Sequence, residues 1–435
     1  MLHSLPPTLD VPIPEGVAIE DVWVPARRGT VPAPPSVSNT LGLNPPVSSP
    51  PVSSVLRRPI GSVSVSVPAK NEMARLPQFF ASLRTAVLAA MGEGIACEVV
   101  FALDGCTDGS RGFVEAQHLG FPCPVRHVLL GALGYSHAGR ARRAAMQAAL
   151  RQRAFDPSHA ILTTDADSLV DRDWIVATAR ALRHTDLVAG YVEWDDETPI
   201  AALTEQEAYF DRLHRWRRRI DPVAYDASDP HHKSYGASLA IRQNAYRRVG
   251  GLPELRSSED VALCRAVRLA GLRLRQDRSV RVLTSTRRRG RATGGFSDAI
   301  VSVDAMLERG EELRVPCPES LTAQYRRAAR LRAGYEALAS AASGGTPVVA
   351  NDLDWSGRGS GRASGRAGLG LGVHEIALAR KARSADAFVT RVMEPEPGAD
   401  MGADVTPRVP LKAAIWRLDA LKRKNREIGG KGETR

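Results

Sequence analysis

The segment AILTTDADS, residues 160–168, decides the fold, because it joins a short apolar run to two aspartates. The run Ala160–Thr164 is typical of a buried strand, and Asp165 and Asp167 follow where that strand ends. Two carboxylates that leave a strand end one residue apart can place hard oxygen ligands on one divalent cation. Taken alone, the motif is also compatible with an Asp-rich turn that caps the next helix.

Outward from this segment, short apolar runs alternate with helical patterns. Strands are expected at Val63–Val67, Cys97–Leu103, Val125–Leu130 and Ala160–Thr164. Helices are expected at Leu76–Met91, Gly112–His118, Ala138–Arg153 and Trp174–His184. This alternation predicts an α/β fold with a Rossmann-like, mostly parallel central sheet that is flanked by helices. In such sheets, ligands bind beyond the carboxyl ends of the strands.

The unusual residues of the first half fall at those carboxyl ends. The first strand runs into PAKNE at residues 68–72 and the second ends at Asp104, so three of the first four strands bring carboxylates to one edge. An acidic edge of this kind implies a counter-charge. Asp104 is compatible with accepting N–H groups of a nucleobase and equally with a turn before Gly105. The segment GRARR at 139–143 opens a helix, whose free N–H groups favour a diphosphate.

The second half contains a candidate general base. YGASLAI at residues 235–241 predicts a further strand, and Ser258 precedes a helix that carries Asp260 in its first turn. The helix dipole favours the ionised form of a carboxylate in that turn. An ionised aspartate at a cleft edge can act as a general base, and simple helix capping is the alternative.

Composition divides the chain into a folded body and two arms. Residues 1–60 hold 13 of the 29 prolines, which predicts a disordered arm. We expect one catalytic body at 61–340, followed by a Gly/Ser/Arg-rich tail at 341–435 that is disordered apart from helical stretches. Helices are expected in that tail at Val373–Val389 and Leu411–Asn425. The second, at 411–425, is basic and amphipathic, and it suits docking on the body or peripheral contact with the inner face of a membrane.

The net charge of +11 is local rather than global. Residues 273–291 contribute +7 and residues 411–435 contribute +5, so the rest of the chain is nearly neutral. This pattern argues against a nucleic-acid partner that coats the whole surface. Five separated cysteines without CxxC spacing suit a reducing compartment, and no apolar run reaches the length of a membrane span. We therefore expect a cytoplasmic protein.

Taken in order, these motifs resemble the family 2 glycosyltransferases, which have the GT-A fold. The resemblance covers residues 62–295 and is carried by PAKNE at 68–72, Asp104 with Asp108, GRARR at 139–143, DAD at 165–167, GAS at 236–238 and Gly250-Gly251 leading to Glu259-Asp260. It implies an enzyme that moves a sugar from a nucleotide-diphosphate sugar to an acceptor hydroxyl, with inversion. It also implies a nucleotide-sugar-binding half at 61–170 and an acceptor half at 171–300.

The resemblance implies roles for individual residues. Those assigned to the nucleotide sugar are Pro68, Asn71, Glu72, Asp104, Gly139, Arg140, Asp165, Arg287 and Arg291. Asp167, with Asp165, would bind Mg²⁺ or Mn²⁺, and Asp260, with Glu259 beside it, would deprotonate the acceptor. The residues assigned to the acceptor pocket are His232, Gly236 and Ser238.

Two departures from the family pattern narrow the expectation. The chain lacks the Gln-x-x-Arg-Trp motif and the membrane helices of processive members, which favours a soluble, non-processive enzyme. In their place stands TSTRRRGRATGGF at 284–296, where Arg287 or Arg291 would approach the diphosphate or an anionic acceptor, or else belong to a solvated basic loop. The alternative functions are an Arg-rich nucleic-acid-binding protein without catalysis and a sugar nucleotidyltransferase, although PAKNE is not the early Gly-rich motif of the latter.

Overall fold

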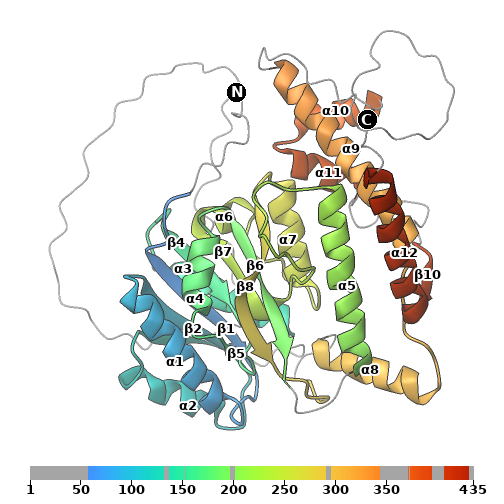
Figure 1. Ribbon diagram of the computed structural model, residues 1–435. Coiled ribbons are helices and arrows are strands. Elements are labelled where there is room, and N and C mark those ends of the chain that lie inside the picture. Colours follow the sequence, from blue (N-terminus) through green and yellow to red (C-terminus); the bar gives the residue numbers. More distant parts are fainter. Residues whose placement is uncertain are drawn as a thin grey trace, which may run out of the picture.

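The computed structural model describes residues 57–131, 137–151, 153–195, 201–290, 295–342, 371, 373–393 and 406–430. Its centre is an eight-stranded sheet (Figure 1). The strands in chain order are β1 (Ser62–Ala69), β2 (Ala96–Asp104), β3 (Val125–Leu130), β4 (His159–Thr163), β5 (Leu169–Val170), β6 (Leu187–Trp194), β7 (Leu239–Arg242) and β8 (Leu274–Thr284). Across the sheet they lie in the order β3-β2-β1-β4-β7-β6-β8-β5.

The sheet is mostly parallel, as the sequence predicts. Strand β1 pairs in parallel with β2 and β4, β2 with β3, and β6 with β8. Strand β7 runs antiparallel to both β4 and β6, and β5 runs antiparallel to β8. Because β1, β2 and β4 point the same way, their carboxyl ends meet at one edge of the sheet, where ligands bind in α/β folds.

Helices cover both faces of the sheet (Figure 1). They are α1 (Leu76–Gly92), α2 (Ser110–Ala116), α3 (Ala138–Arg151), α4 (Trp174–Ala181), α5 (Ala201–Ile220), α6 (Gln243–Arg248), α7 (Glu259–Leu269), α8 (Phe296–Glu308), α9 (Pro318–Ala342), α10 (Val373–Lys381), α11 (Ala385–Met393) and α12 (Leu411–Gly430). Helices α1 and α4 share one core with β1, through Phe79, Trp174 and Val65. On the other face, α3 packs on β2 and β3, and α7 packs on β7.

Strand β1 shows how the sequence produces this layering. Its first six residues alternate Ser and Val, and all eight of its residues are buried, because helices cover both faces of a parallel sheet. The valines Val63, Val65 and Val67 join the core of α1. The serines occupy the opposite face, where Ser64 lies beside Glu98 in register. Alternation therefore separates an apolar face from a small, polar face that α3 can approach closely.

One predicted strand is shorter than expected. Residues Gly236–Ser238 form a 3-10 turn, η2, and the strand begins at Leu239. Side-chain contacts hold the turn in place: the carboxylate of Asp260 accepts the Gly236 N–H at 2.8 Å, and Ser238 Oγ accepts the indole N–H of Trp174 at 3.1 Å. These contacts link segments far apart in the chain, so the local pattern of 235–241 did not reveal them.

The C-terminal helices dock on the body. Instead of one helix at Val373–Val389, the chain forms α10 and α11, and Phe388 packs on Leu331 of α9. Helix α12 buries Leu411, Ala414 and Leu418 against α5 beside it (Figure 1). A short strand β10 (Arg408–Pro410) pairs antiparallel with β9 (Arg314–Pro316) just before it. The apolar face of α12, for which the sequence also allowed contact with a membrane surface, thus packs against the protein itself.

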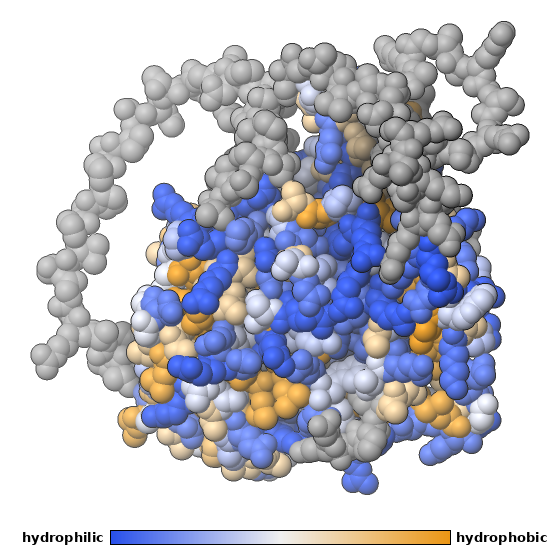
Figure 2. All heavy atoms as spheres, in the orientation of Figure 1, coloured by the Kyte–Doolittle hydropathy of each residue, from blue (hydrophilic) through white to orange (hydrophobic). Residues whose placement is uncertain are grey.

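The sequence predicts the proline-rich arm at residues 1–60. Residues 1–56 lie outside the described residues, and only the last four positions of the arm lie within them. Much of the Gly/Ser/Arg-rich tail, at 343–370 and 394–405, also lies outside them. Within the described ranges, no helix combines the length and the apolar character needed to cross a membrane. In the view of Figure 2, hydrophilic side chains cover most of the surface and apolar side chains form separate patches.

Candidate active site

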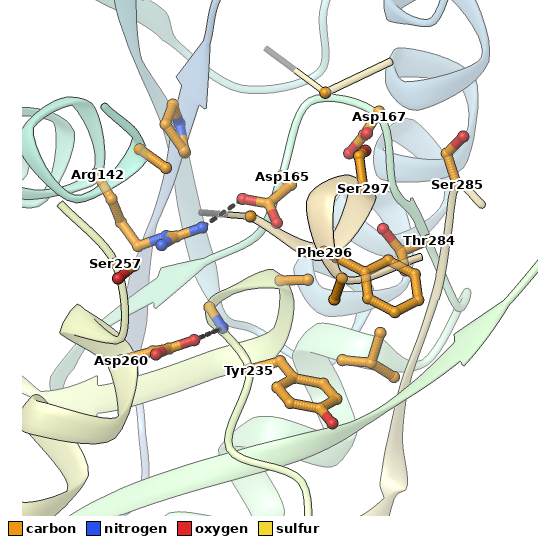
Figure 3. A pocket seen from close by; sticks show the side chains of 18 of the residues that line it. Arg142, Asp165, Asp167, Tyr235, Ser257, Asp260, Thr284, Ser285, Phe296 and Ser297 are labelled. Atoms are coloured by element: carbon orange, nitrogen blue, oxygen red, sulfur yellow. Dashed lines mark hydrogen bonds and ion pairs between the residues drawn. The ribbon is translucent and has the colours of Figure 1, made fainter. Parts of the chain in front are cut away.

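A cavity of about 500 Å³ opens at the carboxyl edge of β1, β2 and β4 (Figure 3). Nine of the residues that the sequence singles out line it: Pro68, Glu72, Asp104, Asp165, Asp167, Gly236, Glu259, Asp260 and Arg287. They come from segments spread over more than two hundred positions of the chain. The structure thus brings most of the candidate residues together at the strand ends, where the sequence predicts a site.

The β1–β2–β4 side of the cavity is acidic. Asp165 and Asp167 follow β4, and Glu72 and Asp104 approach from the loops after β1 and β2. Burial raises the pKa of Asp167 to about 7, with the charges of Asp165 and Glu72 adding to the rise and Arg287 opposing it. Carboxylates crowded in this way stabilise positive charge among them.

Arg287 supplies positive charge to this cluster from the loop after β8. Its two terminal nitrogens form a fork on Glu72, at 2.6 Å to each carboxylate oxygen. One of them also lies 2.9 Å from Asp167. Arg287 therefore neutralises carboxylates from two different loops.

Arg142 is a site residue that sequence reasoning missed. Its guanidinium forms an ion pair with Asp165 at 2.5 Å and a second with Glu259, and the side chain is almost fully buried (Figure 3 shows the first pair). It therefore joins the aspartate after β4 to the start of α7. A Cβ on Gly236 would overlap this guanidinium, which explains why that position is glycine. The only sequence signal was its place in GRARR at 139–143, where Arg140 was chosen instead.

Asp260 lines the same cavity and lies below Arg142 and Asp165 in the view of Figure 3. One carboxylate oxygen accepts the N–H of Gly236 at 2.8 Å and the other accepts the N–H of Val261 at 2.7 Å. Its neighbour Glu259 is buried and paired with Arg142. Of these two acids, Asp260 is the one without a basic side chain against its carboxylate among the contacts of the described residues.

Backbone strain marks the two loops that flank the cavity. Among the described residues, two non-glycine residues have positive φ, Asn71 at 53° and Ser258 at 61°. Each directly precedes a cavity acid, Glu72 and Glu259 respectively. Such conformations cost free energy and cluster at functional sites, where the surrounding structure holds them.

Aromatic side chains line the other side of the cavity, and the sequence did not predict them. Trp194 at the end of β6 and Phe296 at the start of α8 stack with ring centroids 5.1 Å apart. Tyr235 lies near Phe296 in Figure 3, and its hydroxyl donates to Glu207 on α5 at 3.2 Å. Trp194 stands at a strand end, as the acids do, so its position was the one available signal.

Glu207 is fixed as an anion in this wall. His232 Nε2 lies 3.1 Å from it and Lys233 Nζ 3.2 Å from it. Burial alone would raise the pKa of Glu207, but the hydrogen bond to His232 and the charges of His232 and Lys233 hold it below its ordinary value. His232 also contacts Asp211 at 2.9 Å. His232 thus supports Glu207 rather than lining the cavity.

Four other predicted residues lie behind the cavity wall. Asn71 accepts the N–H of Thr107 at 2.7 Å, which ties together the loops after β1 and β2. Arg140 is buried 3.6 Å from Asp104. Gly139 lets the start of α3 approach the backbone of Leu255, and Ser238 holds Trp174. Arg291 lies outside the described residues.

The two aspartates after β4 fit a divalent cation that takes further ligands from a substrate. Over the ranges that the structure describes, no group of three or more His, Cys, Asp or Glu side chains could hold a metal ion by itself. Mg²⁺ usually binds through one or two carboxylates plus substrate phosphates. Asp165 and Asp167, which both line an open cavity, match that donor set.

Comparisons with known proteins find a family model for part of the chain and solved structures of partial similarity. No curated protein sequence matches the chain. A structure of S. aureus TarS in complex with UDP is 16% identical over 52% of this chain and 60% of that chain, with a TM-score of 0.37. The mannosyltransferase PcManGT from Pyrobaculum calidifontis, in complex with GDP-Man and Mn²⁺, is 16% identical over 67% of this chain and 79% of that chain, with a TM-score of 0.38.

At such identities and TM-scores these two structures add nothing on substrate or mechanism. The family model described as Glycosyl transferase family 2 matches residues 64–242. That range runs from β1 through β7 and includes the DAD motif and the acidic loops. Residues 64–242, which form most of the mostly parallel sheet between helices, are therefore similar to the glycosyl transferase family 2 domain.

Proposed function

We propose that this protein transfers a sugar from a nucleotide-diphosphate sugar to an acceptor hydroxyl, with a divalent cation at Asp165 and Asp167 and with Asp260 as the general base. The observation that supports the proposal is one cavity that is lined by both aspartates and by Asp260. The match of residues 64–242 to the model of glycosyl transferase family 2 supports the reaction class. The donor and acceptor halves would be residues 61–170 and 171–300.

Residues of the donor half, together with Arg287 from the loop after β8, would bind the nucleotide diphosphate. Glu72 and Asp104 would accept N–H or O–H groups of the nucleoside, since buried carboxylates make strong charge-assisted hydrogen bonds. Arg142 and Arg287 would offset the charge of the phosphates. A Mg²⁺ or Mn²⁺ ion held by Asp165 and Asp167 would neutralise the negative charge that develops on the leaving diphosphate.

Asp260 would activate the acceptor. Its N–H contacts with Gly236 and Val261 fix the carboxylate in orientation. In one displacement, Asp260 takes the proton of the acceptor hydroxyl as that oxygen bonds to the anomeric carbon and the bond to the diphosphate breaks. A single displacement inverts the configuration at that carbon. Trp194 and Phe296 would shield the reacting atoms from water and contact the acceptor.

A binding screen with one variant and one control tests the proposal. Thermal unfolding of the full chain is measured with UDP-, GDP- and dTDP-sugars, each with and without Mn²⁺. We expect one donor to raise the unfolding temperature in a Mn²⁺-dependent manner, and Asp167→Asn to remove that rise. The control is Asp173→Asn, because Asp173 lies on the exterior close to the same loop. The proposal is wrong if no donor stabilises the wild type, or if Asp167→Asn responds as Asp173→Asn does.

A further inference from the structure

Resting on the proposed function, we propose that Arg287 is an internal counter-cation that keeps free metal out of the donor site. It would hold Glu72 and Asp167 while the site is empty and move to the diphosphate when a nucleotide binds. Metal binding would then depend on the nucleotide. The structure carries this inference in the contacts of Arg287, in an unused donor on its side chain and in its position.

Arg287 contacts Asp167, one of the two carboxylates that we propose bind the cation. Its guanidinium forms a fork on Glu72 at 2.6 Å and lies 2.9 Å from Asp167. The side chains of Glu72 and Asp167 are only 6% and 14% exposed, so water does little to screen these charges. A divalent ion at Asp167 would meet the positive charge of Arg287 within a few ångströms. Free metal must therefore displace the arginine before it can bind.

Displacement without a replacement partner is costly. If Arg287 left, Glu72 would remain buried without that ion pair, and a buried charge that loses its partner strongly destabilises the folded state. A nucleotide diphosphate changes this balance, because its oxygens give the guanidinium a new anionic partner. The metal and the nucleotide together can thus displace Arg287 from the acids, whereas the metal alone cannot.

The side chain of Arg287 also has an unused hydrogen-bond donor. Its Nε is buried and has no hydrogen-bond partner in the part of the chain that the structure describes. Other arginine Nε atoms among the described residues are unpaired as well, so this N–H supports the inference only because Arg287 lines the cavity. A phosphate oxygen is an acceptor of the right charge. Arg287 lines the cavity, so the side chain can meet such an oxygen without a change in the fold.

The next residue provides a matched control. Arg288 belongs to the same loop, but it pairs with Asp304 of α8 at 2.6 Å and does not line the cavity. Its side chain is 32% exposed. Arg287→Met and Arg288→Met therefore remove the same charge from adjacent positions, and only the first touches the acidic cluster.

The test is a titration of Mn²⁺ alone, followed by electron paramagnetic resonance of the free ion, on the full chain and both variants. We expect Arg287→Met to bind Mn²⁺ at least about tenfold more tightly than the wild type, because a positive charge next to the ion is removed. Arg288→Met should stay within about twofold, since the charge of Arg288 is paired with Asp304 and lies outside the acidic cluster. Arg287→Met should also bind UDP or GDP with Mn²⁺ more weakly than the wild type does.

Thermal unfolding covers the case in which Arg287→Met folds poorly. The variant should unfold at a lower temperature than the wild type, and Mn²⁺ should raise that temperature by more in the variant. Arg287→Lys, which keeps the charge, should bind free Mn²⁺ as weakly as the wild type. A purely structural role predicts instability that Mn²⁺ does not repair, and this result would overturn the inference.

Failure of this inference can be distinguished from failure of the proposed function. If the wild type binds a nucleotide with Mn²⁺ but Arg287→Met binds free Mn²⁺ no more tightly than the wild type, only the inference is wrong. If neither protein binds Mn²⁺ or any nucleotide, the proposed function is wrong and the inference falls with it.

Discussion

Strands β1, β2 and β4 carry buried polar side chains at both ends, and the two ends differ in how those groups are paired. At the amino end, His159 lies 2.9 Å from Ser62 and 3.1 Å from Ser64 through its two ring nitrogens. Glu98 accepts from Ser64 and forms ion pairs with Arg126 and Arg153. Each polar group there finds its partners within the chain.

At the carboxyl end, the acids line a cavity of about 500 Å³ instead. Asp167 has a raised pKa, Arg287 retains an unpaired N–H, and Asp260 faces open space. Both ends of the sheet carry polar side chains that are buried or partly buried. The carboxyl end differs from the amino end because its charged groups are incompletely paired and lie beside a cavity that can hold a ligand. Burial of polar groups alone therefore does not identify a site.

The largest expected effect comes from replacing the proposed general base at the carboxyl end. Asp260→Asn should lower donor turnover by about 10²–10⁴-fold, since a general base contributes that much. Its affinity for the nucleotide sugar should stay unchanged, because Asp260 is not among the residues proposed to bind the nucleotide sugar. Release of the nucleoside diphosphate measures the first quantity and calorimetry the second. A fully active Asp260→Asn enzyme would remove the assignment of the base.

A smaller effect is expected from crowding the same end without touching an acid. Gly236→Ala would push Arg142 away from Asp165 and Glu259. Overpacking of this kind costs about 1–3 kcal/mol, so stability and donor affinity should both fall. Gly112→Ala is the control, because nothing lies within 4 Å of a Cβ there. Equal behaviour of the two variants in urea unfolding would contradict this reading of Gly236.

The sequence predicted which residues lie at the carboxyl end better than it predicted the contacts between them. Strand ends and acids follow from local patterns, so the positions of Glu72, Asp104 and Asp165 could be anticipated. The role of Arg142 could not, because it depends on a contact with Glu259 that lies 117 positions away. The same is true of the stacking of Trp194 on Phe296.

The reversed strand β7 could not be anticipated either. Its apolar pattern is the same whichever way the strand runs, since periodicity carries no direction. Direction is decided by pairing with β4 and β6 over long range. For the same reason the sequence did not distinguish the satisfied serines and histidine at the amino end from a site.

A change at the amino end should affect stability and leave binding alone. Glu98→Gln weakens the ion pairs with Arg126 and Arg153, and a lost hydrogen bond to a buried charged group costs about 1–3 kcal/mol. Donor affinity should not change, because Glu98 does not line the cavity. Glu115→Gln is the control, since its pair with Arg111 is exposed. Loss of donor binding in folded Glu98→Gln protein would show that the two ends are coupled.

The smallest expected effect is a pH dependence that comes from His159. Burial lowers the pKa of His159 to about 4, and the charge of Arg153 acts in the same direction against the smaller opposing charges of Glu98 and Asp156. In the unfolded chain this histidine takes up a proton near its ordinary value of about 6.5. Stability is therefore complete above about pH 6.5 and is lost as the pH falls towards 4, where the folded protein also takes up the proton.

Between pH 6.5 and 5.5 the loss from this one residue amounts to about 1 kcal/mol. His214 and His231, whose pKa values burial also lowers, add to the slope of the wild type in the same direction. His159→Gln should therefore reduce the slope of unfolding free energy with pH without abolishing it, and His374→Gln on the exposed face of α10 should leave it unchanged. An unaltered slope in His159→Gln would mean that His159 titrates in the folded protein, and that the amino end is as open to a proton as the carboxyl end is to a ligand.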